Sequence, residues 1–126
     1  MATEAPASAA RRAAFTLGVD AEAAASALLA AQGFGIVATR VRTPRGEIDL
    51  VARRESLLLF VEVKARARLD TAAESILPRQ RRRIAEAAEI FLARHPEYAS
   101  LDMRFDVVLV APARPPLHLA NAFEVE

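Results

Sequence analysis

The chain has 126 residues, a length that suits a single domain. Its hydrophobic fraction of 53% and charged fraction of 26% are typical of a globular protein with a conventional core. It contains no cysteine, which excludes disulfide bridges, cysteine nucleophiles and thiolate metal sites. The formal net charge is only +1, yet 12 of the 17 basic and only 6 of the 16 acidic residues lie between Arg40 and Arg83. Such a basic block favours a phosphate-rich partner, and the alternative is a set of solvated arginines.

The first 17 residues are rich in alanine and show no apolar period, so we expect a disordered or loosely ordered tail over residues 1–17. Residues 18–126 are then one domain. The pair Arg11-Arg12 is not followed by a clean apolar stretch, since Asp20 and Glu22 interrupt it. No uncharged run approaches the ~18 apolar residues that a membrane span needs. We therefore expect a cytoplasmic protein without a membrane partner.

The first expected element is a helix over residues 21–32, which are almost all Ala and Leu. Asp20 is suited to cap its start and Gly33 to end it. The segment Phe34–Arg42 has the pattern of a strand, and Thr43-Pro44-Arg45-Gly46 that of a turn.

The next segment, Glu47–Arg53, alternates as a second strand. Its pattern predicts that Ile48 and Leu50 point one way and that Glu47, Asp49 and Val51 point the other. After a short polar connection, Leu57–Lys64 is a nearly continuous apolar run, as expected of a central strand covered on both faces. A polar stretch from Ala65 to about Thr71 follows.

A second helix is predicted from Pro78 to Arg94, with an apolar stripe facing the core. Arg104–Ala111 is a further apolar strand, and Leu117–Ala120 has the length of a short edge strand. Three strands that follow one another can form a meander. The helix then carries the chain across to a fourth strand, which such a crossover makes parallel to its partner.

Among the charged residues of the two central strands, three together suggest a site: Asp49, Glu62 and Lys64. Glu62 and Lys64 are two residues apart and share a face of their strand. If residues 54–57 form a four-residue loop, Arg53 faces Leu58, which places Asp49 opposite Glu62 and Glu47 opposite Lys64. Side chains opposite one another have Cβ atoms ~5 Å apart.

Two carboxylates that close repel unless a proton or a cation lies between them. Mg²⁺ suits this position because it takes oxygen ligands and keeps several waters, and Mn²⁺ is a second candidate. The ammonium of Lys64 would lie beside that cation and could steady a phosphate oxygen. Two carboxylates, a divalent cation and an ammonium group are what metal-assisted phosphodiester hydrolysis requires. The alternative is a simple ion pair between Glu62 and Lys64, with Asp49 as a residue at the end of a strand.

Two motifs resemble a known family. They are Gly46-Glu47-Ile48-Asp49-Leu50-Val51-Ala52 and Phe60-Val61-Glu62-Val63-Lys64-Ala65-Arg66, and the likeness extends to Arg104-Phe105-Asp106-Val107-Val108 and Asn121-Ala122-Phe123. They resemble the YraN-like family of uncharacterised bacterial proteins, placed in the PD-(D/E)XK nuclease superfamily near the Holliday-junction resolvases. The resemblance covers about residues 18–123. It implies an α/β fold with a restriction-endonuclease-like αβββαβ core, in which a mixed sheet is flanked by helices.

The resemblance also implies roles for individual residues. Asp49 matches the metal-binding aspartate, and Glu62 and Lys64 match the E-x-K pair. Glu22 falls at the position of a first-helix glutamate that supports the metal site, although Ala21 stands where relatives have glycine. The resulting catalytic set is Asp49, Glu62, Lys64 and Glu22, and the metal set is Asp49, Glu62 and Glu22. Glu47 is either a peripheral ligand or a salt-bridge partner of Lys64.

The densest basic run begins the second helix, where Arg79 and Gln80 occupy a segment that reads Lys-Gln-Arg in relatives. The run lacks interleaved aromatic residues, so backbone recognition is favoured over base stacking. The expected nucleic-acid contacts are Arg45, Arg66, Arg79, Gln80, Arg82 and Arg83. Asp106 is interpreted as a strand residue paired with Arg104 or with a neighbouring loop, and His95 and His118 as structural residues.

The sequence thus predicts a Mg²⁺-dependent endonuclease acting on DNA, with branched DNA as a candidate substrate. Two alternatives stay open, because a fold does not fix a function. One is a nucleic-acid-binding module without turnover, and the other is a protein-interaction domain. A homodimer would suit a branched substrate, but no feature of the sequence demands one.

Overall fold

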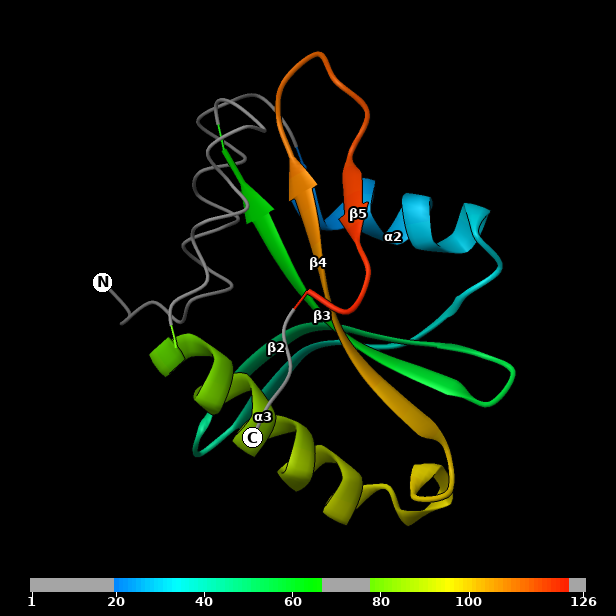
Figure 1. The fold of residues 1–126 in the computed structure, drawn as a ribbon, viewed down its shortest axis with the longest axis vertical. Coiled ribbons are helices and arrows are strands. Elements are labelled where there is room, and N and C mark those ends of the chain that lie inside the picture. The colour runs from blue at the N-terminus through cyan, green and yellow to red at the C-terminus, as the bar shows by residue number, and fades with distance from the viewer. Residues whose placement is uncertain (1–19, 67–77, 123–126) are drawn as a thin grey trace.

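The computed structural model describes residues 20–66 and 78–122 (Figure 1). The expected tail at residues 1–17, most of the polar stretch after Ala65, and Phe123 lie outside the described residues. The elements within these ranges are α2 (Ala21–Ala31), β1 (Gly35–Thr43), β2 (Gly46–Arg54), β3 (Leu57–Ala65), α3 (Pro78–Arg94), the short 3-10 helix η2 (Pro96–Tyr98), β4 (Asp102–Val110) and β5 (Leu117–Leu119).

In the described part of the chain, five strands form one sheet in the order β1-β2-β3-β4-β5. β3 and β4 run parallel, and the other neighbours are antiparallel. The crossover through α3 is what makes β4 parallel to β3. The mixed sheet with its two helices confirms the α/β class and the order of the restriction-endonuclease-like αβββαβ core.

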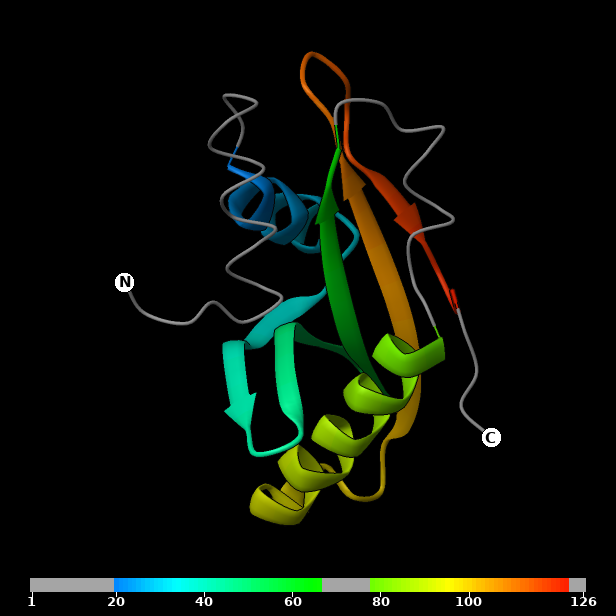
Figure 2. The same cartoon turned by 90° about the vertical axis from the view of Figure 1, so that its left-hand side faces the viewer.

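The two helices cover opposite faces of the sheet (Figures 1 and 2). Leu29 of α2 packs into a cluster with alternate residues of the strands, among them Leu59, Val61 and Val108. Phe91 of α3 packs on the other face with Phe60 and Leu58, and the rings of Phe60 and Phe91 meet edge to face. Both faces of β3 are therefore buried, as its nearly unbroken apolar run predicts.

The helix α2 is bounded by the residues that the sequence predicts, Asp20 and Gly33. The side chain of Asp20 accepts a hydrogen bond from the backbone N–H of Ala23, which satisfies one of the open donors of the first turn. Gly33 ends the helix with a φ of +89°, a left-handed conformation that glycine adopts without strain.

One prediction for β2 is wrong, because Ile48 and Leu50 do not point the same way. Leu50 packs on the α2 side, whereas Ile48 joins the α3 side. The pairs Thr39–Leu50 and Val41–Ile48 enclose Arg40, which takes a left-handed φ of 51°. The β1–β2 ladder also has a register irregularity between Ile36 and Ala38, so the strict alternation on which the prediction rested is not kept along this pair of strands.

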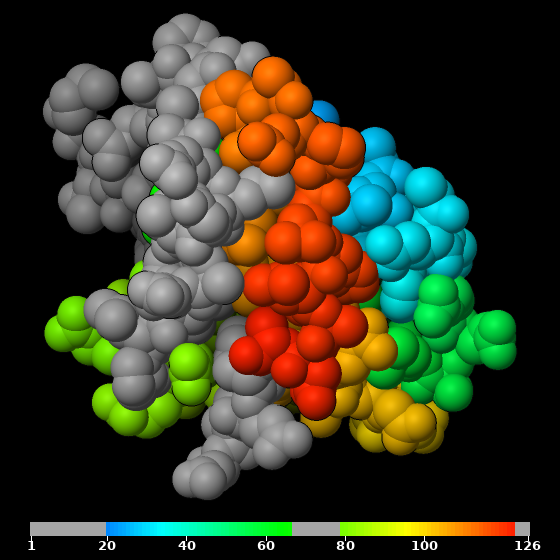
Figure 3. Space-filling model, turned by 45° about the horizontal axis from the view of Figure 1, so that its top comes forward, coloured from blue at the N-terminus to red at the C-terminus, as the bar shows by residue number. Residues whose placement is uncertain are grey.

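Figure 3 shows α2, the turn between β2 and β3, and the region of β4 and β5 side by side on one face of the molecule. The backbone N–H of Asp102 donates to the carbonyl of Ser56, which fixes the start of β4 beside that turn. Neither helix in the described ranges has the length and apolar character needed to cross a membrane.

Candidate active site

The candidate site lies where β2 and β3 stop pairing. The predicted register is confirmed, since Arg53 pairs with Leu58 and the ladder continues to Leu50 and Val61. The connection is tighter than the expected four-residue loop, because Arg54 and Leu57 also pair. Beyond Leu50 the strands separate, and Figure 2 shows the β1–β2 hairpin curving away from β3.

The side chain of Asp49 occupies the gap between the strands. Its Oδ2 accepts a hydrogen bond of 2.7 Å from the backbone N–H of Val63. This carboxylate therefore takes the place that a backbone carbonyl of β2 would have in a continued ladder. Asp49 and Glu62 are not ladder partners, but a hydrogen bond joins their two carboxyl groups.

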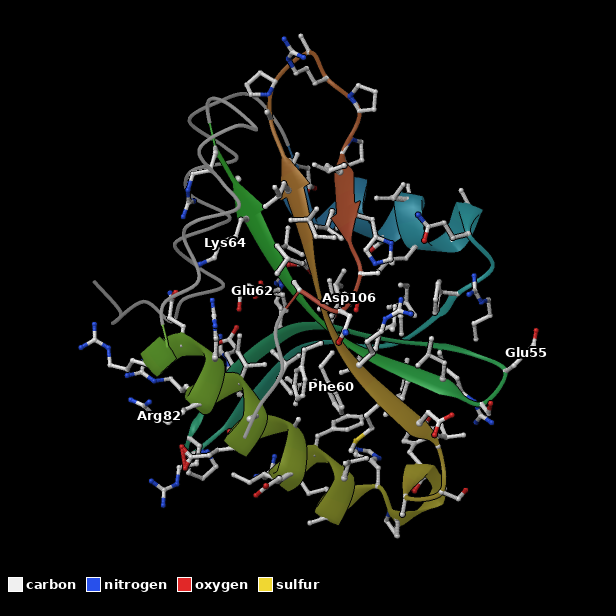
Figure 4. The ribbon with its side chains drawn as sticks, in the orientation of Figure 1. Glu55, Phe60, Glu62, Lys64, Arg82 and Asp106 are labelled. Atoms are coloured by element: carbon white, nitrogen blue, oxygen red, sulfur yellow. The ribbon has the colours of Figure 1, made fainter. Side chains whose placement is uncertain are left out.

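Four charged residues are buried at this gap: Glu47 (7% exposed), Asp49 (3%), Glu62 (7%) and Lys64 (8%). Figure 4 shows Glu62 and Lys64 on the same side of β3. Their β4 neighbours, Val107 and Leu109, pack against Ile84 near the start of α3. The cluster therefore lies between the β1–β2 hairpin and the first turns of α3.

The electrostatics of the pair favour a shared proton. Burial raises the pKa of Asp49, and hydrogen bonds from Glu62 and Val63 oppose this rise. Burial and the negative charge of Asp49 together raise the pKa of Glu62 well above its usual range. The ammonium of Lys64 lowers the pKa of both carboxyls, and the charge of Glu47 raises both. Glu62 is thus the carboxyl that holds its proton more strongly.

A divalent cation could take the place of that proton, because both carboxyls are buried and in contact. Among the described residues, no set of three or more His, Cys, Asp or Glu side chains is arranged to hold a metal directly. The residues present fit Mg²⁺, which is usually bound through one or two carboxylates and keeps several waters.

Glu22 lies on α2 and does not act on the pKa of Asp49 or Glu62. Its carboxylate binds Arg40, with the Arg40 Nε at 3.2 Å from Oε2. Arg40 in turn lies between the pairs that flank Asp49 in the β1–β2 register. Glu22 is therefore connected to the edge of the site through Arg40, and its role toward a metal stays a prediction.

The predicted nucleic-acid contacts fall mainly on the hairpin tip and the start of α3. Arg45, Arg79, Arg82 and Arg83 are exposed, and Figure 4 shows Arg82 at the start of α3, away from the strands. The tip of the β1–β2 hairpin packs closely on α3 at Gly46. A Cβ at this position would lie 2.7 Å from Cγ of Arg83, so a residue without a side chain allows the close approach. Gln80 is half-buried on the same turns, and Arg66 at the end of β3 donates to the carbonyl of Ala65.

A second polar cluster lies toward β5 and was only partly predicted. Asp106 is fully buried and accepts two hydrogen bonds of 2.9 Å from Arg104, which confirms that expected pair. It also accepts one from the backbone N–H of Asn121 and contacts His118 Nε2 at 2.6 Å. His118 Nδ1 lies 2.9 Å from Gln32.

The histidine contact was missed because spacing along the chain does not reveal it. The signal lies in the β4–β5 register, where Val108 pairs with His118, so that Asp106 is a diagonal neighbour of His118 on one face. Burial would raise the pKa of Asp106, but the hydrogen bonds from Arg104, Asn121 and His118 outweigh it and lower that pKa.

Comparison with known proteins identifies the family of this chain. The sequence profile described as "Uncharacterised protein family UPF0102" matches residues 21–110. A UPF0102 protein of Rhodopseudomonas palustris strain BisB18 is 59% identical over 114 residues, which cover 90% of this chain and 84% of that protein. A UPF0102 protein of Bradyrhizobium sp. strain BTAi1 is 55% identical over 119 residues, covering 94% of this chain and 88% of the relative.

Proposed function

The chain belongs to the uncharacterised protein family UPF0102, which is the YraN-like family, and we propose that it is a divalent-cation-dependent endonuclease acting on DNA. One observation supports this most directly. Two carboxyl groups with raised pKa values, Asp49 and Glu62, are buried in contact beside the Lys64 ammonium. Burying two carboxyls together is costly, and a cation held between them would offset that cost.

Each residue of the candidate site would have a distinct role. Asp49 and Glu62 would hold Mg²⁺ or Mn²⁺, and the cation, when bound, supplies Lewis acidity and lowers the pKa of its water. Asp49 is fixed in place by the Val63 N–H. Lys64 lies on the same side of β3 as Glu62, its charge acts on both carboxyls, and it would stabilise negative charge on a phosphate oxygen. Glu22 would act on this site through Arg40.

DNA is favoured as the substrate by the basic residues next to the cluster. Arg82 and Arg83 precede Ile84, which packs on the β4 neighbours of Glu62 and Lys64. A phosphate backbone held by these arginines would therefore pass close to the acidic pair. Branched DNA is included because of the family resemblance. The proposal places this activity in the cytoplasm, on the strength of the sequence alone.

The test uses the purified full chain with branched and linear DNA in Mn²⁺, Mg²⁺ or EDTA. Asp49→Asn and Lys64→Met should each reduce the cleavage rate by at least about a hundredfold, because each removes a group that acts on the transition state. Glu55→Gln is the matched control, since Glu55 is exposed on the β2–β3 turn away from the cluster (Figure 4). It should cut at the wild-type rate.

The same experiment separates the alternatives. Salt-dependent DNA binding without cation-dependent cleavage would replace the nuclease with a non-catalytic nucleic-acid-binding module. No measurable DNA binding at low salt would leave a protein-interaction domain on this fold. Equal cleavage by wild type and both site variants would assign the activity to a contaminant.

A further inference from the structure

Glu47, at the start of β2, is the buried charge that neither the fold nor the proposed function explains. Only 4% of its side chain is exposed. Within the described ranges its Oε1 is buried and has no hydrogen-bond partner. A buried carboxylate oxygen without a donor costs free energy, so such a group calls for a ligand or a function.

Its nearest basic group does not account for its burial. Arg42 Nε lies 3.8 Å from Oε2, which is too far for a hydrogen bond, and the Arg42 side chain is 76% exposed. Solvent-exposed pairs of this kind contribute little to stability. The other partner considered from the sequence was Lys64, but no ion pair joins Glu47 to it in the described part of the chain.

The environment of Glu47 is the acidic cluster itself. Its negative charge acts on both Asp49 and Glu62, which places its carboxylate within electrostatic reach of each. It is not a direct third ligand in this arrangement, because no three such side chains are disposed to hold a metal among the residues described. A water held by a cation at this cluster would supply the hydrogen-bond donor that Oε1 lacks.

We propose that Glu47 is a positioning residue of the site, whose Oε1 accepts a hydrogen bond from a water bound to the divalent cation. The inference rests on the proposed function, because it requires a cation at Asp49 and Glu62. Outer carboxylates of this kind orient the bound water and raise the affinity for the metal, and their loss costs about 10–100-fold in affinity.

The test measures Mn²⁺ binding to the full chain by titration calorimetry, without DNA. Glu47→Gln should weaken Mn²⁺ binding about tenfold or more. Its melting temperature in EDTA should equal or exceed that of wild type, because the variant removes a negative charge that acts on Asp49 and Glu62. Glu86→Gln is the matched control, since Glu86 also lies 3.8 Å from an arginine, Arg45, but is exposed. It should bind Mn²⁺ as wild type does.

Arg42→Gln distinguishes the positioning role from a structural one. If Glu47 acts only as the partner of Arg42, this variant should weaken Mn²⁺ binding as much as Glu47→Gln does, and that result would overturn the inference. Wild-type affinity in Glu47→Gln would also overturn it, while leaving the cation site at Asp49 and Glu62 intact. If wild type binds no Mn²⁺, or if Asp49→Asn binds it equally, the cation site of the proposed function fails, and the inference fails with it.

Discussion

Replacing Glu62 by glutamine should stabilise the cation-free protein at pH 8. Burial and the charge of Asp49 raise the pKa of Glu62 well above its ordinary value of 4.5. Its ionised form is therefore disfavoured in the folded state. The stability that comes from the neutral carboxyl is fully present below pH 4.5 and is lost as the pH rises through the raised pKa. Glutamine is neutral at every pH and does not suffer this loss.

The size of the effect follows from the charges around Glu62. Two unit charges about 5 Å apart repel by roughly 3 kcal/mol at an effective dielectric constant of ~20. The attraction between Glu62 and Lys64 offsets part of this repulsion and is lost in the variant. A net gain of about 1–2 kcal/mol remains, which corresponds to a rise in melting temperature of roughly 4–8 °C for a domain of this size.

The assay is thermal unfolding followed by circular dichroism in EDTA, at several pH values from 4 to 8. The gain of Glu62→Gln should shrink as the pH falls and disappear near pH 4, where Glu62 is protonated in the folded and the unfolded chain alike. Glu55→Gln, on the exposed turn, should change stability by less than about 0.5 kcal/mol at any pH. A variant less stable than wild type at pH 8, or a difference that does not vary with pH, would refute the reasoning.

Three further substitutions test the scaffold, each by urea unfolding. Asp106→Asn should lower the free energy of unfolding by about 2–4 kcal/mol, because Arg104 loses its buried partner. The pKa of Asp106 is lowered in the folded protein, so its carboxylate contributes its full stability above the ordinary value of 3.8 and loses it as the pH falls below that value. The cost of the substitution should therefore shrink in acid. Gly46→Ala should cost about 1–3 kcal/mol, because its Cβ would lie 2.7 Å from Cγ of Arg83 and push the hairpin tip away from α3. Asp20→Ala should cost about 1 kcal/mol through loss of the N-cap hydrogen bond to α2.

The pairing of β2 with β3 could be predicted because local rules determine it. Apolar residues crowd both strands, and a polar turn of few residues separates them, so only one register buries the apolar side chains. That register, with Arg53 facing Leu58, is the one observed. The same reasoning brought Asp49 close to Glu62, and the two carboxyls are in contact.

The point at which the pairing ends could not be predicted. At that point the side chain of Asp49 accepts from the Val63 N–H in place of a backbone carbonyl. Hydrophobic periodicity carries no signal for such a replacement, because it reports burial and not hydrogen bonding. The contact of Glu22 with Arg40 could not be predicted either, since the two residues are 18 positions apart and lie on different elements.

Two buried aspartates on this sheet show why residue type alone does not identify a functional carboxylate. Asp106 accepts hydrogen bonds from Arg104, Asn121 and His118, and its pKa is lowered. Its charge is fully compensated by the protein, so it holds β5 and the following segment against β4. Asp49 accepts from one backbone N–H and lies against Glu62, and the pKa values of both carboxyls are raised. Within the described residues, Lys64 is the positive charge that acts on Asp49 and Glu62, and a divalent cation would add to it.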